Sequence, residues 1–208
     1  MIAAAHVRAA RVFDVRTGKP QPEALVLDAN VLFFVHYPSF GTLAAVGGEP
    51  PSVYRTREYG AALKRALRAK TRLFTSATTL LEFAHIVEKV ELEISWRKAG
   101  GQGAFEYKQV REQLAAQLEE IRKTVLVYVS AVRKITTIIE ALHAEGTLAV
   151  WRGSCGDTSD SALAAAALRE GVPDLLSDDA DFLTYRDLHL FTANQAAIDL
   201  AKSVGRLG

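Results

Sequence analysis

The chain has 208 residues, 49% hydrophobic and 24% charged, and its 25 Lys and Arg residues balance 24 Asp and Glu residues to a formal net charge of +1. This composition is that of a folded globular protein and excludes a disordered chain, a collagen and, with Cys155 as the only cysteine, a disulfide scaffold. Because there is neither an apolar run of about 18 residues nor the apolar core of a secretory signal, we expect a cytoplasmic protein with no membrane partner.

The first half of the chain predicts two strands and two helices, the second of which is capped by Thr78 or Thr79 and carries Glu82 before Gly100 interrupts it. Residues 1–23 are interrupted by glycine and proline and predict an N-terminal extension before one domain over residues 24–208. The continuously apolar run 24–27 is typical of a buried parallel strand. Apolar residues at helical spacing predict a helix over residues 59–70, and residues 72–77 are strand-like.

The second half is mostly helical in pattern. Good helix formers dominate residues 104–145, which predict a long helix or a helical pair, and we interpret the apolar run 124–132 as helix rather than strand. The alanine-rich segment 157–171 predicts a compact helix that ends at Gly171. The remaining elements are strands over 174–179 and 188–193 and a closing helix over 194–204. Strands that alternate with helices predict a parallel α/β sheet with helices on both faces.

Acidic side chains follow the predicted strands or lie near the starts of the predicted helices. They are Asp28 with Asn30, Glu82, Asp157 with Asp160, and Asp178, Asp179 and Asp181. Ligands of such sheets bind outside the carboxyl ends of the strands, so we expect these groups at one rim. Carboxylates that are brought together repel one another unless cations neutralise them, and hard oxygen ligands suit Mg²⁺ or Mn²⁺.

Four segments resemble the motifs of the PIN-domain nucleases, which include the VapC-type toxins of toxin–antitoxin pairs. They are, in the family's order, VLDANVL with Asp28, SATTLLEFAHIV with Glu82, DSALAAAAL with Asp160, and LLSDDADF with Asp179 and Asp181. The resemblance covers roughly residues 24–200 and implies an α/β fold with a PIN-like parallel sheet flanked by helices. It also implies that Asp28, Glu82, Asp160 and Asp179 bind the metal and are catalytic, with Asn30, Asp157 and Asp181 as accessory residues.

The function that this resemblance implies is a metal-dependent endoribonuclease that uses Mg²⁺ or Mn²⁺, with RNA as its partner. The separations of Asp28 from Glu82 and of Glu82 from Asp160 are longer than in compact VapC-type toxins, which predicts an inserted loop and a helical insertion at about residues 90–145. A toxin role is one option within this function. An antitoxin protein and a second copy of the chain are therefore further candidate partners.

Some candidate residues have a second interpretation. Asp28 and Asn30 are also the residue types that end a strand in an Asx turn. Asp157 is positioned to cap a helix and to form a capping box with Asp160, and we assign Asp157 a structural role. We expect Asp178 to be exposed.

A basic segment and two rival functions complete the sequence-based picture. Residues 55–72 hold seven basic residues against one acid, and they form either a solvated helix face or a track for RNA phosphates that includes Arg65 and Arg68. One rival is a non-catalytic PIN-like module that binds RNA or protein. The other is a haloacid-dehalogenase-like phosphatase, which needs an aspartate where this chain has Asn30.

Overall fold

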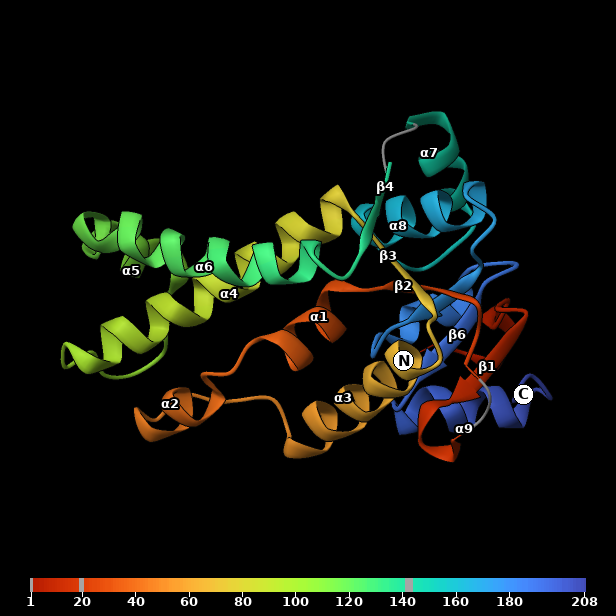
Figure 1. Ribbon diagram of the computed structural model, residues 1–208, viewed down its shortest axis with the longest axis horizontal. Coiled ribbons are helices and arrows are strands. Elements are labelled where there is room, and N and C mark those ends of the chain that lie inside the picture. The colour runs from red at the N-terminus through yellow and green to blue at the C-terminus, as the bar shows by residue number, and fades with distance from the viewer. Residues whose placement is uncertain (1, 19–20, 141–143) are drawn as a thin grey trace.

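The computed structural model describes residues 2–18, 21–140 and 144–208, and in these ranges the chain forms one parallel sheet flanked by helices (Figure 1). The strands are β1 (Arg11–Asp14), β2 (Ala24–Leu27), β3 (Arg72–Ser76), β4 (Thr137–Ile139), β5 (Asp174–Leu176) and β6 (His189–Thr192). Their order across the sheet is β1-β6-β5-β2-β3-β4, and every neighbouring pair is parallel. The predicted α/β fold is thus confirmed.

The helices of the described ranges agree with most of the sequence-based elements. They are α1 (Ala29–His36), α2 (Phe40–Ala45), α3 (Val53–Arg68), α4 (Ala77–Lys98), α5 (Tyr107–Gln113), α6 (Leu118–Arg133), α7 (Ala144–Arg152), α8 (Thr158–Arg169) and α9 (Gln195–Ser203), with 3₁₀ turns η1 (Ala4–His6), η2 (Val15–Thr17), η3 (Ala115–Gln117) and η4 (Ala180–Thr184). The apolar run 124–132 is helical, as predicted. Strand β4 lies inside the range 104–145 that was expected to be helical, so the helix prediction was wrong there; residues 135–139 are all β-branched, which favours a strand.

Two apolar layers cover the sheet, one on each face. Leu25 and Leu27 of β2 pack in the layer formed with α1, α3 and α4, whereas Ala24 and Val26 pack in the layer formed with α8 and α9. Successive side chains of a strand point to opposite faces, so a strand that is covered on both sides must be apolar throughout. This explains the uninterrupted apolar run of β2.

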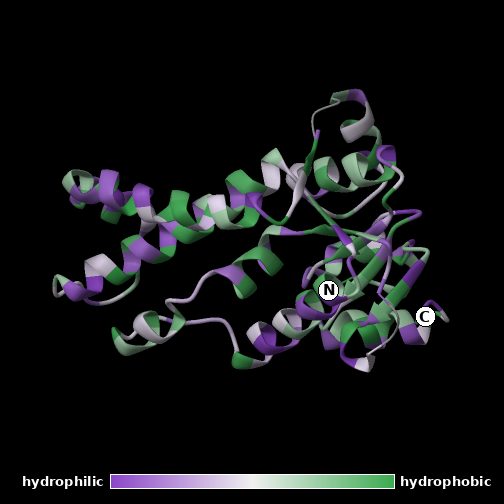
Figure 2. Cartoon of the chain, viewed as in Figure 1, coloured by the Kyte–Doolittle hydropathy of each residue, from purple (hydrophilic) through white to green (hydrophobic). Residues whose placement is uncertain are grey.

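Helix α4 continues beyond the sheet and packs with α5 and α6 in an arm, which extends to the left in Figure 1. Hydrophobic and hydrophilic residues alternate along this arm (Figure 2), as expected where one side of each helix packs on its neighbours. Glu88 of α4 forms ion pairs with Arg111 of α5 at 3.7 Å and with Arg122 of α6 at 3.4 Å. No helix in the described part of the chain combines the length and apolarity needed to cross a bilayer.

The expected N-terminal extension contributes to the sheet. Strand β1 pairs with β6 from Arg11 opposite His189 to Asp14 opposite Thr192, so residues 11–14 form one edge of the sheet. The division at residue 23 and the bounds of the insertion at about 90–145 stay predictions, and residues 141–143 lie outside the described ranges.

The sheet brings together the two strand ends that carry the candidate site. Strands β2 and β5 are neighbours, with Leu27 opposite Leu176, and the Asp28 amide donates to the Leu176 carbonyl at 3.2 Å. The residues that follow both strands therefore meet at the carboxyl edge, where parallel sheets bind ligands.

Candidate metal centre

Asp28 is the most buried carboxylate of the candidate site, with 4% of its surface exposed. It caps α1, where its Oδ1 accepts a hydrogen bond from the Ala29 amide at 2.7 Å. Its Oδ2 accepts from the Ser177 hydroxyl at 2.6 Å and from the Asn30 side-chain amide at 3.4 Å. Burial raises the pKa of Asp28 to about 6, against the opposing effect of the Ser177 hydrogen bond.

Ser177 connects the ends of β2 and β5. It is fully buried, and besides donating to Asp28 its Oγ accepts a hydrogen bond from the Asp179 amide at 2.9 Å. Asp179 in turn caps η4 by accepting from the Asp181 amide at 2.8 Å. The serine hydroxyl thus fixes the Asp28 carboxylate relative to the backbone that carries Asp179. The role of Ser177 is not apparent from the sequence, in which it is a single serine within the strand predicted over 174–179.

Asp157 and Asp160 open α8 in the capping box that the sequence predicts. Asp157 Oδ1 accepts from the amides of Ser159 at 2.8 Å and Asp160 at 2.9 Å, and the Asp157 amide donates to Asp160 Oδ2 at 3.4 Å. Asp157 is exposed and Asp160 is half-buried. Burial, followed by the charges of Asp157, Asp28 and Asp179, raises the pKa of Asp160 to about 8.

Glu82 lies in the second turn of α4, which starts where Ser76 Oγ accepts a hydrogen bond from the Thr79 amide at 3.0 Å. The Glu82 side chain is half-buried rather than fully exposed. Burial raises its pKa to about 7, and the next contributions are the charges of Asp28, Asp157 and Asp179. Glu82 therefore belongs to the same electrostatic cluster as the acids of the two strand ends.

The tightest group of carboxylates in the described part of the chain consists of Asp160, Asp179 and Asp181. One oxygen atom from each lies within 4.8 Å of the other two. Asp181, which the resemblance places among the accessory residues, thus takes part in the tightest group, and its pKa is raised by burial and then by the charge of Asp179. Asp28 and Glu82 lie outside this group but close enough for their charges to interact with it. We call the five carboxylates together the acidic rim.

The chemistry of the acidic rim fits a hard divalent cation. Every donor atom is a carboxylate oxygen, and Mg²⁺ and Mn²⁺ prefer such ligands. The raised pKa values of Asp28, Glu82 and Asp160 show that burial and neighbouring negative charge disfavour their ionised forms. A cation held between them would reverse this effect, so the residues present are suited to a divalent metal ion.

Asp178 is buried, and the expectation that it is exposed was wrong. Only 8% of its surface is accessible, because two partners from α3 satisfy its carboxylate. Arg55 Nε donates to Oδ2 at 2.8 Å and the Tyr59 hydroxyl donates to Oδ1, also at 2.8 Å. Asn194 Nδ2 donates to the Asp178 backbone carbonyl at 2.7 Å. Asp178 therefore links α3 and the start of α9 to the end of β5 through hydrogen bonds and an ion pair.

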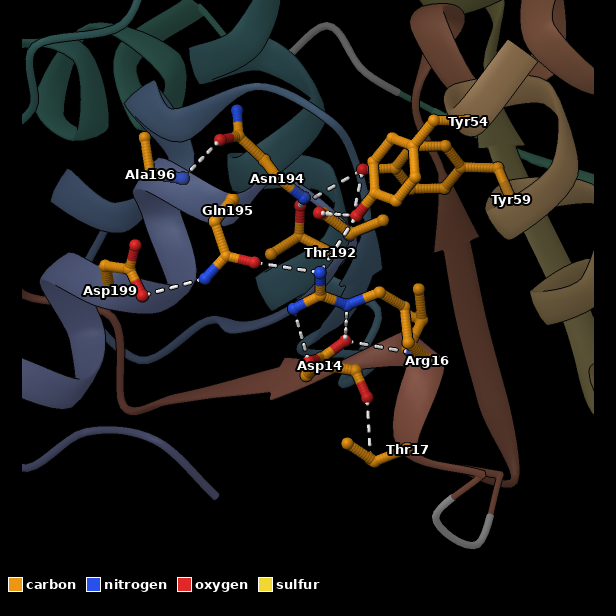
Figure 3. Close-up of polar contacts among 12 residues, drawn as sticks. Asp14, Arg16, Thr17, Tyr54, Tyr59, Thr192, Asn194, Gln195, Ala196 and Asp199 are labelled. Atoms are coloured by element: carbon orange, nitrogen blue, oxygen red, sulfur yellow. Dashed lines mark hydrogen bonds and ion pairs between the residues drawn. The ribbon is translucent and has the colours of Figure 1, made fainter.

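A polar network beside β1 and β6 contacts the first turn of α3 through Tyr54 (Figure 3). Arg16 donates to both oxygens of Asp14, at 2.7 and 2.6 Å, and to Gln195 at 2.8 Å. The same guanidinium donates to the Tyr54 hydroxyl at 3.1 Å. Because Tyr54 directly precedes Arg55 in the chain, this network places Arg55 at the rim.

The structure does not bring Arg65 and Arg68, the candidates for RNA binding, to the acidic rim. They lie near the far end of α3, ten or more residues after Arg55 and hence about 15 Å or more along the helix axis. The Arg65 guanidinium donates to the backbone carbonyl of Val15, and Arg68 is exposed. Of the basic segment, Arg55 is the residue that reaches the site. Sequence pattern alone could not distinguish it from its neighbours.

Comparison with known proteins gives one match. A sequence model of the family described as PIN domain matches residues 52–188, about two thirds of the chain. The matched range contains Glu82, Asp160, Asp179 and Asp181, whereas Asp28 lies before it. No curated protein and no solved structure matches the chain.

Proposed function

Because this chain belongs to the PIN-domain family, whose members are generally metal-dependent nucleases, we propose that it is an endoribonuclease that hydrolyses RNA phosphodiester bonds with Mg²⁺ or Mn²⁺. The observation that carries the proposal is the acidic rim, in which Asp160, Asp179 and Asp181 approach within 4.8 Å of one another. Asp28 and Glu82 flank this group, so carboxylates from four separate segments converge on one place.

The residues of the acidic rim have distinct roles in the proposed reaction. Asp160, Asp179 and Asp181 would hold the divalent ion, with Asp28 and Glu82 completing its surroundings. The bound ion would lower the pKa of water and stabilise charge that develops on the phosphate. Attack by water would leave a 5′-phosphate and a 3′-hydroxyl.

Ser177 and Asn30 act on the orientation of Asp28 rather than on the substrate. The Ser177 hydroxyl holds Asp28 Oδ2 at 2.6 Å, and Asn30 approaches the same oxygen at 3.4 Å. This arrangement also argues against the phosphatase alternative, because a second carboxylate is absent at position 30. The intact acids of the rim argue against a non-catalytic module. A toxin role with an antitoxin partner stays a prediction.

Cleavage assays test the proposed function. We expect Mn²⁺-dependent cleavage of single-stranded RNA by the wild-type chain, loss of cleavage in EDTA, and loss in Asp28→Asn and Asp179→Asn. Asp199→Asn is the matched control, because Asp199 is exposed on α9 and accepts only a local hydrogen bond from Gln195 at 2.8 Å. Full cleavage by either rim variant, or by wild type in excess EDTA, would contradict the metal-dependent mechanism.

A further inference from the structure

Two recesses adjoin the acidic rim on the side of α1 and α3. The first, of about 360 Å³, includes Asp179 in its wall. The second, of about 440 Å³, lies between α1, the segment 43–51 and α4. Asn30, Phe34 and Arg55 line both recesses, so the two adjoin at these three residues. We call the two together the side groove.

Arg55 supplies the positive charge of the side groove, since no other basic residue in the described part of the chain lines either recess. Its Nε is held by Asp178 at 2.8 Å, and its guanidinium carbon lies 5.7 Å from the centre of the Phe34 ring. The side chain is nonetheless 46% exposed. A guanidinium has five N–H donors, so this fixed cation can present further donors to a phosphate in the groove.

The far end of the side groove has a different chemistry. Apolar side chains form its walls, among them Phe33 and Ile86 together with Val90. Glu49 and Glu93 also line this end. Glu93 is paired with Arg97 at 2.8 Å, so the carboxylate that would repel a phosphate here is that of Glu49. The group that fits here is therefore uncharged, with apolar faces and N–H groups at its edge. A nucleobase has these properties, and stacking on apolar and aromatic side chains is how unpaired bases are bound.

We propose that the side groove is a nucleotide subsite for single-stranded RNA, in which Arg55 holds a phosphate next to the scissile one and the apolar end takes the base of the same nucleotide. This proposal rests on the proposed function, because it assumes that an RNA strand crosses the acidic rim. Only an unpaired base can turn into the groove, so the subsite selects single strands over duplexes. The wall formed by residues 43–51 precedes the range matched by the family, so this part of the subsite comes from outside the matched domain.

Binding measurements on the full chain test the proposal without cleavage. Fluorescence anisotropy with a labelled single-stranded RNA in EDTA gives the affinity of wild type, Arg55→Ala and the control Arg57→Ala, whose side chain is 69% exposed on the same helix. We expect Arg55→Ala to weaken binding roughly tenfold and to lower the log–log salt slope by about 0.7, as for one lost phosphate contact. Arg57→Ala should bind within about twofold of wild type.

A second variant tests the base-binding end separately from Arg55 and Asp178. Val90→Trp should fill the recess and weaken binding of the RNA about tenfold, the effect of losing one stacked base. An RNA that lacks the base at the responsible position should bind wild type and Val90→Trp equally well. Thermal melts of each variant show whether it is folded.

Several outcomes would overturn the subsite. An unchanged salt slope in Arg55→Ala would show that Arg55 makes no phosphate contact. Tight binding of a duplex would show that the groove does not select single strands. Equal RNA binding by wild type and Val90→Trp would assign the apolar end to another occupant, such as a protein segment. The proposed function fails differently: if Mn²⁺ supports no cleavage but binding still depends on Arg55 and Val90, the subsite stands and the nuclease activity does not.

Discussion

Replacing Ser177 by alanine tests the connection between the two strand ends. The change removes the 2.6 Å hydrogen bond to the Asp28 carboxylate and the acceptor of the Asp179 amide at 2.9 Å. A hydrogen bond to a charged group is worth about 1.5–3 kcal/mol, and an unsatisfied buried amide costs about 1–3 kcal/mol when water cannot reach it. Because Asn30 at 3.4 Å is a weak substitute, we expect Ser177→Ala to lower the free energy of unfolding by about 2–4 kcal/mol at pH 8.

The destabilisation by Ser177→Ala should depend on pH. The hydrogen bond favours the ionised form of Asp28, whose pKa in the folded protein is about 6. At pH 8 the variant therefore loses a charge-assisted bond. At pH 5 the Asp28 carboxyl is mostly protonated, so the variant loses only a neutral hydrogen bond worth about 1 kcal/mol. The difference between wild type and variant should shrink as the pH falls through 6.

Urea unfolding in EDTA at pH 5 and pH 8 measures this effect. Ser203→Ala is the control, because its exposed hydroxyl donates only to the Leu200 carbonyl in the last turn of α9, at 2.7 Å. It should change the unfolding free energy by less than about 0.5 kcal/mol at either pH. A Ser177→Ala variant as stable as wild type at pH 8, or equally destabilised at both pH values, would refute the proposed link between Ser177 and the Asp28 charge.

Three further predictions concern the metal-free protein and the caps. Folding raises the pKa values of Asp28, Glu82 and Asp160, so the folded state binds protons more tightly than the unfolded state. The unfolding free energy of the metal-free protein should therefore fall as the pH rises from 4 to 8, by about 3 kcal/mol for Asp28 alone. Urea titrations in which the unfolding free energy rises over this range would contradict this. Saturating Mn²⁺ at pH 8 should restore about 2.7 kcal/mol at a hundredfold excess over Kd, and less in Asp160→Asn; calorimetric melts insensitive to Mn²⁺ would count against the site. Asp157→Ala should cost about 1 kcal/mol by thermal melt while RNA cleavage persists, and lost cleavage in a folded variant would make Asp157 functional.

The sequence predicted those parts of the fold in which local pattern and tertiary environment agree. Strand β2 has the bounds of its apolar run, because a strand covered on both faces must be apolar at every position. Helix α8 agrees as well: its cap, alanine run and terminal Gly171, which has a φ of +68°, all act locally.

The sequence did not reveal features that depend on partners distant in the chain. Asp178 is buried because Arg55 and Tyr59, more than 100 residues earlier, satisfy its charge. Strand β1 joins the sheet through β6 near the other end of the chain. Ser177 matters only because β2 and β5 are neighbours. None of these pairings has a periodicity or spacing that one sequence could show.

The motifs predicted which acids converge but not their ranking within the site. Asp28 and Asp179 both follow strands, and either position supports a ligand in sequence terms. The geometry instead groups Asp179 with Asp160 and Asp181, because the turn η4 brings Asp181 back toward the start of α8. Asp28 is more buried and is held by Ser177, which favours an orienting contribution at the base of the rim.

Anomalous diffraction from crystals grown with Mn²⁺ tests the central claim most directly, namely that the acidic rim binds a catalytic divalent ion. The account predicts an anomalous peak within bonding distance of carboxylate oxygens of Asp160, Asp179 and Asp181, about 2.0–2.3 Å for such an ion. The peak should vanish in crystals of Asp160→Asn. A rim without a peak at saturating Mn²⁺, or a peak held by other residues, would contradict the account.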